Sequence, residues 1–201
     1  MTDDPEVWPP YEVGQPKHIH ALGVIAAKYN GLEFSLFCLM MDYTGLSSET
    51  AQWLFANLSN NLRLDLLKRC VREKETEPVM KEYVLHFADC FDVCAENRNI
   101  LMHSMVGKTN DAALLNFAKS SKNDPRKVNT LDLRLGDIRR VADAITIVDG
   151  MGLQLHSRFL ARRSPKPPDL PDDLWAFVTS LPKKPPIPSK LLKQNPPARK
   201  A

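Results

Sequence analysis

The chain has 201 residues, of which 43% are hydrophobic and 25% are charged, and its formal net charge is +3. This length is sufficient for one sizeable core, and the composition is that of an ordinary globular protein. The charge is too small to indicate nucleic-acid binding by itself. The sequence contains no run of about 18 uncharged apolar residues, so we expect no membrane-spanning helix. Its acidic, proline-bearing start, "MTDDPEVWPP", is unlike a signal peptide.

The four cysteines favour a reducing, cytoplasmic compartment. Cys38, Cys70, Cys90 and Cys94 all lie within apolar helical patterns, and none of them forms a CxxC pair. In such patterns a free cysteine acts as a small buried hydrophobic residue. Disulfide bonds are therefore not expected, which agrees with a cytoplasmic location.

The first half of the chain predicts helices. Residues 1–16 hold four prolines and are expected to form an N-terminal arm. Apolar residues then repeat on one helix face from about Lys17 to Tyr43, and Gly45 should end this helix. A second helix should begin at Ser47 or Ser48 and run to about Arg72, either as one helix or as two short ones with a break near residues 60–61.

A third helix is predicted from Pro78 to about Gly107, where the glycine should end it. Its core positions alternate at spacings of four and three residues, and Arg98 is the single polar member of the series. The positions are Met80, Val84, Phe87, Phe91, Cys94, Arg98, Leu101 and Met105.

The pattern changes after Gly107. Short apolar segments between turn signals predict strands at residues 112–120 and 126–133, with residues 104–106 as a candidate first strand. A last long helix should span Leu135–Ala161, with Gly150 and Gly152 as positions that kink or weaken it. The predicted fold is mainly α: an antiparallel bundle of four to five helices with a small β-meander inserted before the last long helix.

From Ser164 onward the composition is rich in proline and lysine. We expect a helical domain at residues 17–163 and a tail at residues 164–201, which includes a short helix at residues 172–181 that docks Trp175 and Phe177. The rest of the tail has three interpretations: a flexible solvated segment, a basic segment that holds RNA phosphates, or a polyproline ligand for another protein.

Arg98 needs a partner if it is buried, because an unpaired charge in a core is strongly destabilising. Glu33 is the only charged residue between Lys28 and Asp42 and lies on the apolar side of the first helix. We therefore predict an ion pair between Glu33 and Arg98. The alternative is that Arg98 extends to solvent and that Glu33 is simply exposed.

His103 follows Arg98 by five residues, about 140° around an ideal helix. The two side chains should therefore lie on different faces, whereas Asn99 shares a face with His103, and Glu96 flanks that face. Two copies of this helix around a twofold axis would bring both pairs into one cleft. The spacing thus favours a homodimer with a composite site.

The segment "RNILMH", residues 98–103, resembles the motif of HEPN domains. The resemblance covers roughly residues 17–159 and excludes the strands and the tail. It implies a small helical bundle, often a homodimer, that acts as a metal-independent ribonuclease in bacterial toxin–antitoxin or antiphage systems or is catalytically silent. The implied catalytic residues are Arg98, His103 and Asn99, supported by Glu33 and Glu96. The implied partners are RNA, a second copy and an antitoxin or other protein, without a cofactor.

The chemistry that such a pair needs is compatible with RNA cleavage. The ribose 2′-OH is an internal nucleophile, histidine transfers protons near neutral pH, and arginine holds phosphate. Two alternatives remain open. His86, Cys90 and Cys94 share a helix face and offer three zinc ligands, without an evident fourth. In the second alternative, the chain is a dimeric helical module that binds a partner protein, and His103 only caps the C-terminus of its helix.

Overall fold

The computed structural model describes residues 15–109, 111, 113–120 and 127–191. Most of the predicted arm at residues 1–16 and the end of the predicted tail, residues 192–201, lie outside this range. The elements in chain order are α1 (Pro16–Thr44), α2 (Ser48–Ala56), α3 (Asn60–Lys74), α4 (Pro78–Met102), β1 (Met105–Lys108), β2 (Leu114–Ser120), β3 (Val128–Arg134), α5 (Leu135–Ala161) and α6 (Asp172–Thr179).

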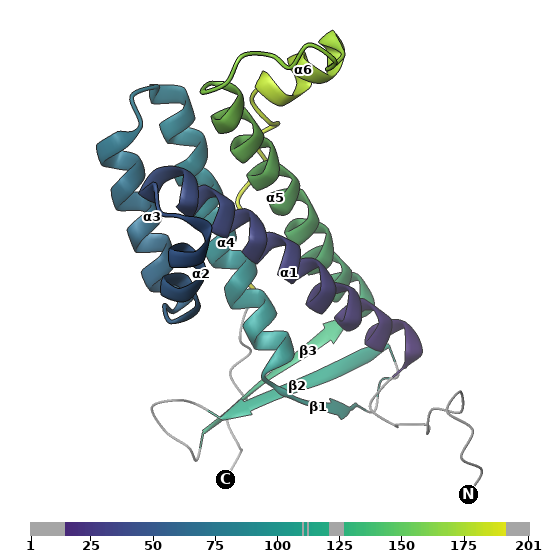
Figure 1. The fold of residues 1–201 in the computed structure, drawn as a ribbon. Helices are drawn as coiled ribbons and strands as arrows, with labels where there is room; N and C mark the ends of the chain where they lie inside the picture. Colours follow the sequence, from purple (N-terminus) through teal and green to yellow (C-terminus); the bar gives the residue numbers. More distant parts are fainter. Residues whose placement is uncertain (1–14, 110, 112, 121–126, 192–201) are drawn as a thin grey trace, which may run out of the picture.

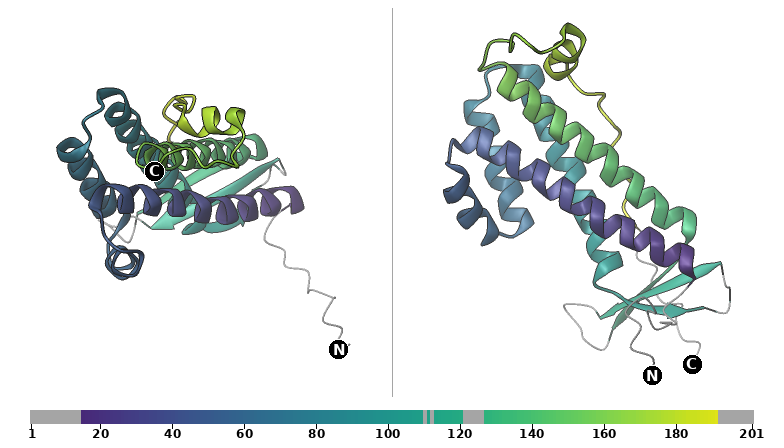
Figure 2. Two further views of the ribbon diagram at one scale, coloured as in Figure 1. Left: turned by 45° about the horizontal axis from the view of Figure 1, so that its top comes forward. Right: turned by 45° about the vertical axis from the view of Figure 1, so that its right-hand side comes forward.

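Three long helices, α1, α4 and α5, form the centre of the molecule. Helices α1 and α5 lie side by side and run in the same direction, whereas α4 runs in the opposite direction (Figures 1 and 2). Helix α3 packs against α1 and α4, and the small sheet lies at the end of the bundle where α1 and α5 begin (Figure 1). The prediction of a mainly helical bundle with a small antiparallel sheet before the last long helix is confirmed.

Local sequence signals account for the helix boundaries in the first half. Gly45 adopts a left-handed conformation with φ of 75° and donates its N–H to the carbonyl of Met41, which ends α1. Ser47 accepts a hydrogen bond from the Thr50 N–H, and Ser59 accepts one from the Leu62 N–H. These two caps start α2 and α3, so the predicted second helix is indeed divided into two.

The sheet is a meander in the order β1–β2–β3, and both pairings are antiparallel. Phe117 lies opposite Leu131, and both side chains are buried against the helices. The prediction that the third helix extends to Gly107 was wrong. Helix α4 ends at Met102, and Gly107 lies within β1. Strand β1 begins at Met105, shortly after α4 ends. Met105 continues the apolar pattern of the helix in the sequence, but in the structure it pairs with β2.

Close contact between α1, α4 and α5 depends on Gly152. A Cβ atom at this position would lie 2.6 Å from a ring carbon of Phe87 and 2.8 Å from the Cβ of Ser35. Helix α5 continues without a break through Gly150 and Gly152. Next to Gly152 on this helix, Met151 is buried and Leu153 is exposed.

The segment that follows α5 packs against the bundle rather than extending into solvent. Helix α6 packs on α5, where Gln154 donates a hydrogen bond of 3.0 Å to the Ser180 hydroxyl. Residues 181–191 then return along α4 and α5, with Pro182 and Pro185 buried. For residues up to 191, the interpretation as a flexible solvated tail is therefore wrong. The prediction that Phe177 docks against the bundle is also wrong, because 59% of this residue is exposed.

Helix α1 is long and apolar enough to span a membrane by length and composition alone. Our sequence criterion, a run of uncharged apolar residues, did not identify it. Within the fold, Ile25, Leu32, Leu36 and Leu39 of α1 are almost completely buried in the core. Since a core helix meets the same length and composition criteria, this property is weak evidence for a membrane span.

Candidate functional site

Arg98 and His103 meet within a single protomer. The Nη1 atom of Arg98 lies 3.1 Å from the Nε2 atom of His103. The prediction that the two side chains lie on different faces was wrong because His103 is not helical. It is the C-cap residue of α4, with φ of −112° and ψ of 10°, and this turn moves its side chain back toward Arg98.

The direction of this contact defines the state of the imidazole. A guanidinium group can only donate hydrogen bonds, so Nε2 of His103 is the acceptor. In the tautomer that matches this contact, the ring proton lies on Nδ1. The His103 side chain is exposed, so the ring is accessible to a ligand.

Asn99 and Tyr29 hold Arg98 in place. The Nη1 atom of Arg98 also donates to the Oδ1 atom of Asn99 at 3.1 Å, and the guanidinium carbon lies 5.2 Å from the centroid of the Tyr29 ring. Burial, with the nearby Glu33 carboxylate, raises the pKa of the Tyr29 hydroxyl, so this group stays protonated at neutral pH. The Nε atom of Arg98 is buried and makes no hydrogen bond within the part of the chain that the structure describes.

The predicted ion pair between Glu33 and Arg98 was wrong. Glu33 instead lies 3.8 Å from Arg63 of α3, measured between Oε1 and Nη1. Arg63 also donates from Nη1 to Oδ1 of Asn60 at 3.3 Å, and Asn60 donates to the Tyr29 hydroxyl at 2.9 Å. The stacking of Arg98 on Tyr29 takes the place of the expected carboxylate partner, because an aromatic face also stabilises a cation.

Glu96 does not support this site. Its carboxylate lies 2.5 Å from Nζ of Lys190, in the segment that returns along α4. The adjacent residue, Asn97, is buried and binds the same segment. Its Nδ2 donates to the Ser189 carbonyl at 2.9 Å, and its Oδ1 accepts from the Leu191 N–H at 2.8 Å. The side of α4 that carries Glu96 and Asn97 therefore binds the C-terminal segment.

The alternative zinc site is not assembled. The Nε2 atom of His86 lies 2.7 Å from the Pro185 carbonyl oxygen, which can only accept a hydrogen bond. Burial raises the pKa of Cys90 to about 11 and that of Cys94 to about 12. Across residues 15–191 apart from the gaps noted above, no three or more His, Cys, Asp or Glu side chains are arranged to hold a metal ion.

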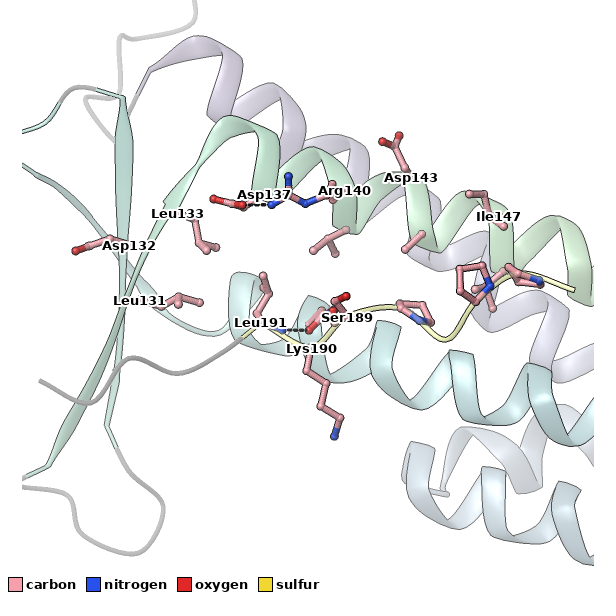
Figure 3. A pocket seen from close by; sticks show the side chains of 17 residues that line it. Leu131, Asp132, Leu133, Asp137, Arg140, Asp143, Ile147, Ser189, Lys190 and Leu191 are labelled. Atoms are coloured by element: carbon pink, nitrogen blue, oxygen red, sulfur yellow. Dashed lines mark hydrogen bonds and ion pairs between the residues drawn. The ribbon is translucent and has the colours of Figure 1, made fainter.

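A large cavity lies on the same side of α4 as Asn97, between α5, β3 and the segment at residues 185–191 (Figure 3). Its volume is about 610 Å³, within the range of small-molecule sites. Leu131, Leu133, Ile147 and Leu191 contribute apolar side chains to its wall, whereas Asp143 and Lys190 point away from it. The wall of the cavity is therefore mainly apolar, although it also includes polar residues of α5, β3 and the C-terminal segment.

Sequence reasoning missed Tyr29, Asn60 and Arg63 as members of the polar cluster around Arg98. Tyr29 belongs to the apolar repeat of the first helix, and Asn60 to the predicted break between helices, and neither signal indicates a polar cluster. Arg63 had no distinguishing pattern, because its role depends on how α3 packs against α1. The "SNNLR" segment, in which a capping serine orients the start of α3, was the available signal for Asn60 and Arg63.

Comparison of the chain with protein-family models, with curated proteins and with solved structures gave no match.

Proposed function

We propose that this protein is a HEPN-like, metal-independent endoribonuclease whose site is built on Arg98 and His103. The observation that carries the proposal is the 3.1 Å contact between the guanidinium and the imidazole, next to the exposed end of α4. A group that binds phosphate and a group that transfers protons are thus adjacent. The resemblance of residues 98–103 to the HEPN motif supports the same assignment.

In the proposed reaction, the phosphodiester of RNA binds to Arg98, which then holds the negative charge that grows in the transition state. Phosphate oxygens would replace His103 as acceptors of the Arg98 hydrogen bonds. The Nε2 atom of His103 would then be free to accept the proton of the ribose 2′-OH, which attacks the phosphorus atom. The products are a 2′,3′-cyclic phosphate and a 5′-OH, so the RNA itself supplies the nucleophile.

A second imidazole would supply the proton for the leaving 5′-oxygen, and we propose that it belongs to a second copy of the chain. Strand β1 begins two residues after His103 and, among the residues that the structure describes, is an edge strand paired with β2 alone. Met105, at the start of this strand, is 77% exposed. Pairing of two β1 edges would bring two His103 residues close to the twofold axis, in agreement with the homodimer that the motif implies.

The alternative function is a catalytically silent helical module that binds a partner protein. It is favoured by the apolar cavity and by the way in which His86 and Asn97 hold an extended, proline-rich segment. Such contacts are typical of surfaces that recognise extended peptides. In that case His103 would only cap α4, and its replacement would leave the binding of the partner protein unchanged.

The test is an RNA cleavage assay with excess EDTA that compares the wild type with His103→Ala and His20→Ala. Both histidines are exposed, and His20 on α1 is the matched control. We expect cleavage by the wild type and by His20→Ala, and a loss of about 100-fold or more in His103→Ala. All three proteins should melt at the same temperature. Equal cleavage by His103→Ala would refute the assignment, and an inactive wild type would favour the binding module.

A further inference from the structure

A small pocket opens between α1, α2 and α3, and its volume is about 220 Å³. Phe37 and Phe55 provide aromatic surface, with ring centroids 5.9 Å apart and an interplanar angle of 79°. Glu33, Gln52 and Arg63 provide polar groups. The pocket is smaller than the 300–1,000 Å³ typical of drug-sized ligands, and it combines an apolar wall with hydrogen-bonding groups. It suits a single planar, polar ring system.

This pocket is connected to the Arg98–His103 pair by direct contacts. Arg98 stacks on Tyr29, Tyr29 accepts a hydrogen bond from Asn60, and Asn60 accepts one from Arg63. Along α1, Glu33 follows Tyr29 by one helical turn, a rise of about 6 Å. A nucleotide next to a phosphate on Arg98 would therefore be able to place its base in the pocket.

We infer that the pocket binds a guanine base of the RNA held by Arg98 and His103. This inference rests on the proposed ribonuclease function, since it places the RNA backbone on Arg98. A base that leaves its stack to enter a pocket needs an apolar face and a partner for its Watson–Crick edge. Phe37 and Phe55 provide the first, and Glu33 with Arg63 provide the second.

Guanine is selected by the order of donors and acceptors along its edge. It presents the O6 acceptor, then the N1–H donor and then the N2 amino donor. A guanidinium next to a carboxylate matches this order, because Arg63 can donate to O6 while Glu33 accepts from N1–H and the amino group. Adenine and cytosine offer a single amino donor beside an acceptor, and uracil places two carbonyl acceptors around its one N–H. In each of these three bases an acceptor atom would lie next to the Glu33 carboxylate, and two acceptors repel each other.

The Nε atom of Arg63 donates to the Phe55 carbonyl at 2.8 Å and Nη1 donates to Asn60, which leaves Nη2 and the Glu33 carboxylate for such contacts. Their closest approach is 3.8 Å, longer than a direct hydrogen bond, and their side chains are 38% and 20% exposed. Phe34, the neighbour of Glu33, is also exposed, and its ring stacks on Phe37 with a centroid distance of 6.4 Å. Exposed aromatic rings next to a base pocket are platforms on which adjacent bases of a single strand stack.

The experiment measures binding without cleavage. Fluorescence anisotropy gives dissociation constants for two fully 2′-O-methylated pentanucleotides, UUGUU and UUAUU, which lack the nucleophile and stay intact. We expect the wild type to bind UUGUU about tenfold more tightly, because a good bidentate base contact contributes about 1–3 kcal/mol of discrimination. Glu33→Gln should remove this preference. Glu73→Gln, which removes an exposed carboxylate from α3, is the matched control and should keep it.

The outcomes separate this inference from the proposed function. Equal affinity of the wild type for both oligonucleotides, or a guanine preference that survives in Glu33→Gln, would overturn the guanine pocket. His103→Ala should keep the preference for UUGUU over UUAUU, because the base pocket does not use the imidazole. A guanine preference together with absent RNA cleavage would support the pocket and refute the nuclease. Binding of free 5′-GMP as tight as that of UUGUU would overturn the assignment to RNA.

Discussion

The Nδ2 atom of Asn97 donates a hydrogen bond of 2.9 Å to the carbonyl of Ser189, although 92 residues separate them in sequence. The same amide accepts a hydrogen bond from the N–H of Leu191, so one side chain binds a donor and an acceptor of an extended backbone. Because Asn97 is buried, both bonds are shielded from water. This amide is a central anchor of the returning C-terminal segment on α4.

Replacing Asn97 by Ala should therefore release the segment. Each lost hydrogen bond contributes about 1 kcal/mol, so the open form should become roughly thirtyfold more populated. Trypsin should then cleave the Lys190–Leu191 bond faster, which mass spectrometry of the product ending at Lys190 would detect. Asn99→Ala, an exposed amide on the same helix, is the control. Unchanged cleavage in Asn97→Ala would mean that other contacts hold the segment.

Two glycines of α5 should respond oppositely to alanine. Gly152→Ala would place a methyl group 2.6 Å from Phe87, and such overpacking should destabilise the fold by about 2 kcal/mol. A methyl group at position 150 would meet no atom within 4 Å, so Gly150→Ala should stabilise the helix by up to about 1 kcal/mol. Urea unfolding midpoints of the two variants test this. Similar midpoints would contradict the close contact between the helices.

The ion pair between Glu75 and Arg162 should make stability depend on acid pH. Burial raises the pKa of the Glu75 carboxyl, but hydrogen bonds from Arg162, Tyr43 and the Glu77 N–H outweigh it and lower the pKa from 4.5 to about 2. The Arg162 contact is bidentate, at 2.7 and 3.0 Å. Since the folded-state pKa is lowered, the stabilisation is present above pH 4.5 and is lost as the pH falls toward 2.

The test compares the wild type with Glu75→Gln across this range. At pH 7 the substitution should lower the free energy of unfolding by about 3 kcal/mol, because it removes one partner of a largely buried pair. The difference between the two proteins should decrease steadily from pH 4.5 to pH 2. A difference that stays constant over this range would show that the ionised carboxylate does not stabilise the fold.

Much of the secondary structure followed from local signals in the sequence. Gly45, the serine before α2, and Pro78 mark helix ends through their own backbone preferences, and these marks agree with the structure. The strands around Phe117 and Leu131 followed from turn signals and a change in period. Such features depend on a few neighbouring residues, which is why one sequence is sufficient to find them.

The candidate site was less predictable because it depends on packing between helices. The partner of Glu33 is Arg63, whose position is fixed only when α3 docks on α1. The contact between Arg98 and His103 depends on one non-helical residue at the end of α4, which an ideal helical wheel places on another face. The packing of residues 181–191 depends on Asn97. Its role cannot be recognised in the sequence, because its hydrogen-bond partners meet it only when the C-terminal segment packs against α4.

The most direct measurement of the central claim is the chemical identity of the new RNA ends. A short RNA is incubated with the purified full chain in EDTA, and the 5′ fragment is analysed by mass spectrometry. Attack by the 2′-OH at the Arg98–His103 pair predicts a 2′,3′-cyclic phosphate on this fragment and a 5′-OH on the other. A 3′-OH paired with a 5′-phosphate would contradict the account, because it would require an external nucleophile.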